Sequence, residues 1–214
     1  MSQTTIPRAA VRGTASGVIF MAFFGTLWAG IGIRGMQGWE FPVLMILSLL
    51  IGVILFIGAM ILIKNSSELP NEVIKKDRDL WRKKNRWFGI IFSLEGIFIA
   101  VAAIICVSTN HLNWFVPVMA LIVGAHFFPL ASLFQVRVYY VTGTLLCLLA
   151  TIVMLTFPVK IIIKDHQVMA WWGSVGFGSA LILWGTGVIV CLKGFRLLSM
   201  AQNEAEKSKI STRL

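Results

Sequence analysis

Six long apolar stretches limit what this chain can fold into. Each holds about 20 residues, enough for one α-helix to cross a hydrocarbon core of roughly 30 Å. Strands of an outer-membrane barrel would instead appear as segments of about ten residues with alternating polarity. Helices also satisfy their own backbone hydrogen bonds, as lipid requires. We therefore predict an all-α polytopic membrane protein, a six-transmembrane-helix bundle spanning about 14–33, 41–63, 87–107, 112–134, 138–159 and 170–192.

Composition agrees with this class of protein. The 214 residues are 57% hydrophobic and only 13% charged, which is unlike a soluble domain. The first apolar stretch follows Arg8 and Arg12, is as long as the others and has no small-x-small cleavage pattern, so we expect it to be a helix and not a signal peptide. We predict a polar N-terminal tail (1–13), a membrane domain (14–201) and a polar C-terminal tail (202–214).

The distribution of Lys and Arg among the connections predicts the orientation. With the N-terminus in the cytoplasm, sixteen of the 19 basic residues fall on the cytoplasmic side, and the other side holds Arg34, Lys160 and Lys164. This positive-inside bias predicts that both termini are cytoplasmic. The net charge of +10 follows from this topology, so it is no reason to expect nucleic-acid binding. Short outer connections without glycosylation sequons fit a bacterial inner membrane.

The connection 64–86 is the one sizeable segment expected outside the membrane, and it carries eight basic residues. Its apolar residues recur at roughly helical spacing, and Pro70 with Asn71 resembles a helix start. We predict a short amphipathic helix on the cytoplasmic headgroups. A docking surface for a soluble protein is the alternative. The expected contacts with anionic lipid come from Lys75, Lys76, Arg82, Lys83, Lys84 and Arg86.

Two ionisable residues inside the predicted spans are the strongest candidates for function. Glu95 lies eight residues from the cytoplasmic start of the third span, and His126 lies eight residues from the cytoplasmic end of the fourth, so both sit about 12 Å deep. The short connection between these spans makes them an antiparallel pair. This arrangement would allow Glu95 and His126 to meet, although the sequence does not determine whether they touch. Such a pair can exchange one proton, as a proton-coupled carrier or relay requires.

Pro129 lies three residues beyond His126. Proline removes one backbone donor, so we expect a kink in the fourth helix beside the histidine. A kink next to a titratable ring resembles solute sites built on broken helices. Prolines are also common in membrane helices that have no such site.

Further residues are candidates to line a pocket with this pair. Tyr140, Thr144 and Trp184 come from the fifth and sixth spans at a similar depth. The alternative is that Thr144 makes an ordinary helix contact and that Tyr140 belongs to the aromatic belt. Small residues are frequent in the first and sixth spans and predict close packing, within one bundle or between copies of the chain.

No motif for an enzyme or a cofactor is present. The sequence lacks a phosphate-binding loop, an HExxH helix and a GxSxG elbow. Cys106, Cys147 and Cys191 are expected at different depths, so we predict no disulfide, and we predict neither a metal site nor a cofactor.

Three functions remain open. Transport of a small solute or ion is favoured, with Glu95 as proton carrier and His126 as its partner. A non-catalytic membrane subunit, sensor or regulator that acts through a protein partner is the alternative, and a homo-oligomer is compatible with it. An intramembrane lipid-modifying enzyme is least favoured, because no nucleophile or acid cluster is visible.

Overall fold

The computed structural model describes residues 8–37, 41–68, 75–163 and 166–211. Within these residues, six α-helices are each long and apolar enough to cross a membrane, which confirms the all-helical prediction. Two short 3-10 helices, η1 (Ser66–Glu68) and η2 (Leu112–Trp114), adjoin them. The α-helices are α1 (Arg8–Gly35), α2 (Phe41–Asn65), α3 (Lys75–Ser108), α4 (Phe115–Phe134), α5 (Arg137–Thr156) and α6 (Ala170–Ser211).

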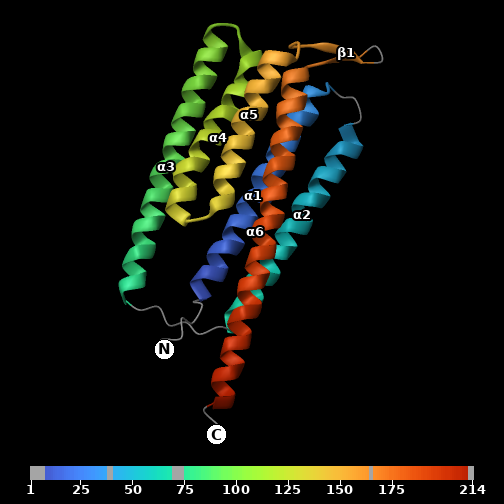
Figure 1. The fold of residues 1–214 in the computed structure, drawn as a ribbon. Coiled ribbons are helices and arrows are strands. Elements are labelled where there is room, and N and C mark those ends of the chain that lie inside the picture. Colours follow the sequence, from blue (N-terminus) through green and yellow to red (C-terminus); the bar gives the residue numbers. More distant parts are fainter. Residues whose placement is uncertain (1–7, 38–40, 69–74, 164–165, 212–214) are drawn as a thin grey trace.

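The helices form two groups of three (Figure 1). In one group, α1 lies along α6 and α2 packs on both. In the other, α4 packs between α3 and α5, and α5 joins the two groups through α6. Helix α3 lies at one edge of the bundle and α2 at the opposite edge (Figure 1). The start of α1, the end of α2, the start of α3 and the end of α6 all lie at the same end of the bundle (Figure 1).

Three elements differ from the sequence-based expectation. Helix α3 is continuous from Lys75 through its membrane-spanning part, so residues 75–86 do not form a separate helix on the headgroups; Pro70 and Asn71 lie outside the described residues. Helix α6 continues to Ser211, where we expected a tail. Helix α5 ends at Thr156, a little before the predicted end of its span. Helices α3 and α6 thus extend beyond the apolar stretches that identified them, because polar residues sustain a helix in water as well.

A β-hairpin closes the end of the bundle opposite to the end of α6. Strand β1 (Ile161–Ile163) pairs antiparallel with β2 (His166–Val168), in a segment that we expected to be an irregular connection. The backbone nitrogen of Met169 donates to the carbonyl of Gly35, and the indole of Trp171 donates to the carbonyl of Phe157. The first bond joins the residue after β2 to the end of α1, and the second joins the start of α6 to the residue that follows α5. Three consecutive isoleucines favour an extended strand, but the run is too short to be told from loop by pattern alone.

Glycines allow α1 and α6 to approach each other closely. A Cβ atom on Gly176 would overlap the backbone of Gly32, and one on Gly35 would overlap the backbone of Gly173. Gly25 leaves room for the ring of Trp184 in the same interface. The small residues of the first and sixth spans therefore pack within one bundle, as one of our two alternatives predicted. Gly30, another small residue of the first span, has open space around it instead.

We predict that Gly176→Ala destabilises the protein by about 1–3 kcal/mol, because the added methyl group would meet backbone atoms that cannot move aside cheaply. Gly185→Ala is the matched control on the same helix, since nothing lies within 4 Å of a Cβ at that position. Thermal unfolding in detergent should show a lower Tm for Gly176→Ala and an unchanged or slightly higher Tm for Gly185→Ala. Equal Tm values for the two variants would contradict the close α1–α6 contact.

Candidate functional site

The structure brings Glu95 of α3 and His126 of α4 together. The Oε1 atom of Glu95 lies 3.4 Å from Nδ1 of His126. The glutamate is 9% exposed, and the histidine side chain is 13% exposed. The antiparallel arrangement of α3 and α4 and the equal depth of the two residues place them side by side, as the sequence predicted.

The hydrogen bonds of this pair are incomplete. Nδ1 of His126 lies 2.7 Å from the carbonyl oxygen of Val123. A carbonyl only accepts, so this nitrogen carries the hydrogen and donates it to Val123. The Glu95 oxygen at 3.4 Å is within ion-pair distance of the ring but beyond the usual range for a hydrogen bond. The second oxygen, Oε2, is buried and has no hydrogen-bond partner among the described residues. Buried polar atoms without a partner are rare and often mark a functional group.

The pair lies where an outlying helix joins the bundle. Helix α3 packs mainly on α4, and it also contacts α1 through two aromatic rings. Phe88 and Phe92 of α3 pack edge-on against Phe20 of α1. Most of the remaining surface of α3 is apolar and exposed. Glu95 and His126 are thus a polar contact within an otherwise apolar helix interface.

The other predicted pocket residues do not share a cavity with this pair. Tyr140 and Thr144 are exposed on the surface of α5, and Tyr140 packs beside Phe128. Trp184 is buried in the α1–α6 interface, where its ring covers Gly25 and its indole nitrogen has no partner among the described residues. We expected these residues to share a pocket because they lie at a common depth in the membrane. They do not, because their side chains face different directions around their helices.

A second buried polar contact links α5 to α6. The hydroxyl groups of Thr142 and Thr186 lie 2.7 Å apart in the buried core, and each also lies close to a carbonyl oxygen one turn earlier in its own helix. Tyr139 is buried nearby and its hydroxyl group approaches Gly17 of α1. Two threonines at similar depth on consecutive helices were the signal available in the sequence. Their hydrogen bonds are complete, which favours a structural role.

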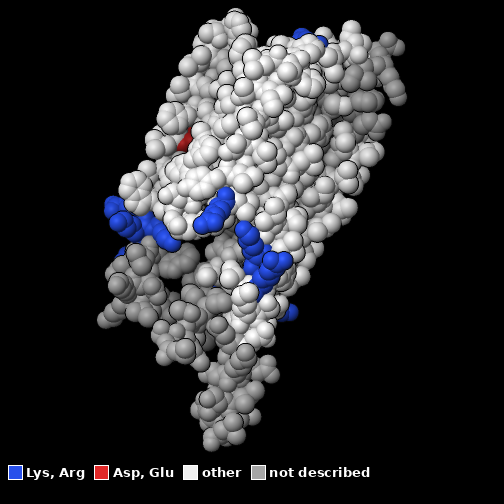
Figure 2. Space-filling model, viewed as in Figure 1, with Lys and Arg blue, Asp and Glu red and all other residues white. Residues whose placement is uncertain are grey.

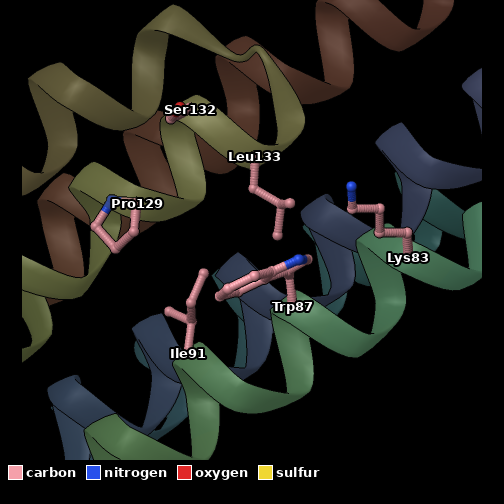
Figure 3. A pocket seen from close by; sticks show the side chains of 6 residues that line it. All are labelled: Lys83, Trp87, Ile91, Pro129, Ser132 and Leu133. Atoms are coloured by element: carbon pink, nitrogen blue, oxygen red, sulfur yellow. The ribbon is translucent and has the colours of Figure 1, made fainter. Parts of the chain in front are cut away.

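A groove between α3 and α4 lies on the basic side of the Glu95–His126 pair. It is open to the outside, has a volume of about 490 Å³ and is lined by Lys83, Trp87, Ile91, Pro129, Ser132 and Leu133 (Figure 3). Neither residue of the pair lines it. Helix α4 passes through Pro129 as one element, so the proline is within the helix, and the kink stays a prediction.

Basic side chains gather at the end of the bundle where α3 begins (Figure 2). Arg82, Lys83 and Arg86 are exposed and Lys84 is half-buried, whereas the side chains of Lys75 and Lys76 lie outside the described ones. Between this end and the few basic side chains at the other end, the surface in this view is uncharged except for a small acidic patch (Figure 2). The described residues contain no group of three His, Cys, Asp or Glu side chains that could hold a metal ion.

We predict that the pair makes the stability of the protein depend on pH. Glu95→Gln and His126→Gln should each flatten the Tm curve between about pH 5 and 9, because folding depends on pH only through groups that bind protons differently in the folded and unfolded states. The double variant should be no flatter than the stronger single one if the two groups act as a unit.

Thr142→Val is the control for the loss of an interhelical hydrogen bond. It should lower stability by about 0.6 kcal/mol at every pH and leave the shape of the Tm curve unchanged. If Glu95→Gln gave the same uniform decrease, the carboxyl group would contribute only an ordinary helix contact.

A family model, described as a family of unknown function (DUF7010), matches residues 8–186. The match includes α1 to α5, both residues of the pair and the first part of α6. No curated protein matches the chain, and no solved structure matches it.

Proposed function

The chain belongs to the DUF7010 family, and we propose that it is a non-catalytic membrane sensor or regulator in which the Glu95–His126 pair controls how α3 attaches to the bundle. One observation carries this proposal. The pair of ionisable residues lies in the interface of an outlying helix and not in a cavity shared by several helices. A change of charge there acts first on the α3–α4 contact.

The physical basis is the low dielectric around the pair. Charges interact more strongly inside a membrane protein than in water, so adding or removing one proton changes the attraction between α3 and α4 substantially. Among the described side chains, the Glu95–His126 pair is the one ion pair or hydrogen bond that joins α3 to another helix. The aromatic contacts of α3 with α1 are compatible with sliding or tilting. The Glu95–His126 contact can therefore act as a switch with α3 as the element that responds.

A partner would respond to the position of α3. The outer face of this helix is apolar over most of its length, which suits a second membrane protein or a second copy of this chain as well as lipid. We propose that the basic end faces the cytoplasm and that the membrane is a bacterial inner membrane, because the excess of Lys and Arg at this end favours that orientation.

Transport is the second candidate, and the unpartnered Oε2 atom of Glu95 favours it. A buried carboxyl oxygen without a partner is a place where a proton or a small cation can bind. Against transport, the groove at Lys83 and Trp87 and a second groove along Ala103–Ser108 of α3 are both open to the surface, and neither contains the pair.

We predict that α3 moves relative to α5 when the pH changes. Spin labels at Ile97 of α3 and Leu148 of α5, both exposed, would report the distance in nanodiscs once the three free cysteines are replaced. The distance distribution should differ between about pH 5 and pH 9 in the otherwise unchanged protein and be constant in Glu95→Gln. Thr142→Val should keep the response. A distance distribution that is independent of pH in the otherwise unchanged protein and in every variant would overturn the sensor proposal.

Proton flux into vesicles separates the two candidates. Purified protein in liposomes with an internal pH dye should give the leak rate of empty liposomes if the pair only senses pH. A flux that depends on Glu95, with or without an added solute, would instead support transport and overturn the sensor.

A further inference from the structure

We propose that the groove between α3 and α4 binds one anionic phospholipid, with the phosphate at Lys83 and an acyl chain running toward Pro129. This is a defined site and differs from general attraction of a basic surface to the membrane. It goes beyond the proposed sensing function, because neither Glu95 nor His126 takes part in binding.

The groove has a polar end and an apolar end. In Figure 3, the amine of Lys83 and the indole nitrogen of Trp87 lie toward one end, whereas Ile91 and Pro129 lie toward the other. Leu133 faces the ring of Trp87 across the groove. The lining therefore matches a molecule with an anionic head and an apolar tail.

The polar end lies at the depth of lipid headgroups. Lys83 is the second residue of the apolar part of α3, which begins at Arg82. Lys83, Trp87 and Ile91 are successive at four-residue spacing, so they line one face of α3 over about 12 Å. That length covers a good part of an acyl chain in one leaflet, whose hydrocarbon is about 15 Å thick. The groove is also open to the side, so lipid reaches it directly from the bilayer.

Charge complementarity selects an anionic headgroup. Arg82, Lys83 and Arg86 are exposed around the polar end of the groove. Basic pockets between membrane helices on the cytoplasmic side are known to hold anionic lipid heads. Trp87 adds an indole N–H group that can donate to a phosphate or glycerol oxygen. A zwitterionic lipid would place its cationic group among these side chains.

The test is native mass spectrometry of the full chain in detergent, titrated with phosphatidylglycerol or phosphatidylcholine. We expect one phosphatidylglycerol to bind more tightly than those that follow, and phosphatidylcholine to show no such first site. Lys83→Ala should weaken the first binding step about fivefold. Lys193→Ala is the control, because Lys193 is also exposed but lies on α6, away from the residues that line the groove.

Two groove-filling variants keep every charge. Leu133→Trp and Ile91→Trp approach the groove from α4 and α3 respectively, so a folding defect in one leaves the other as a test. Each should remove the tight first site while the melting temperature without added lipid stays that of a folded protein. Equal weakening by Lys83→Ala and Lys193→Ala would show diffuse charge attraction and overturn the proposal. Competition by millimolar glycerol 3-phosphate would assign the site to a soluble anion and also overturn it.

Discussion

The close contact between α1 and α6 is the interaction on which the rest of the structure depends. Lipid supplies no hydrophobic force between helices, so membrane helices associate where small residues allow many van der Waals contacts. Gly32 and Gly176 bring the two backbones together, and Trp184 fills the space above Gly25 in the same interface. Helix α2 packs on both helices, and α5 packs on α6. Helices α1 and α6 therefore form the axis of the bundle.

The structural polar contact, between Thr142 and Thr186, lies closer to that axis than the candidate functional contact between Glu95 and His126. Thr142 and Thr186 lie in the core, and their hydroxyl groups have partners. Glu95 and His126 lie at the α3–α4 contact near the edge, where one carboxylate oxygen has no partner among the described residues. A complete hydrogen-bond network stabilises a single arrangement, whereas an incomplete one responds to a proton, an ion or a neighbouring molecule.

The pair and the groove lie along the same helix face. Lys83, Trp87 and Ile91 lead by steps of four residues to Glu95, so a lipid in the groove would end about one turn short of the pair. A lipid that contacts both α3 and α4 would strengthen the same interface that the pair controls. Proton binding and lipid binding would then influence each other through the position of α3, as linkage between two sites requires.

The sequence by itself determined the number of helices, their approximate limits and the common depth of Glu95 and His126. Long apolar stretches have only one solution in lipid, and a short connection makes two consecutive helices antiparallel neighbours. Residues that lie the same number of positions from the membrane surface on two such helices then lie at the same depth. The close α1–α6 packing was also indicated by composition, although the sequence left open whether it joined two copies of the chain.

Only the tertiary structure decided which way each side chain faces. Depth along a helix can be counted, but rotation about its axis depends on packing against helices that are distant in sequence. For that reason Tyr140 and Thr144 lie exposed on α5, and Trp184 lies buried against α1. The groove beside Pro129 was not foreseen for the same reason. An almost uniformly apolar sequence carries little periodicity from which such rotations can be inferred.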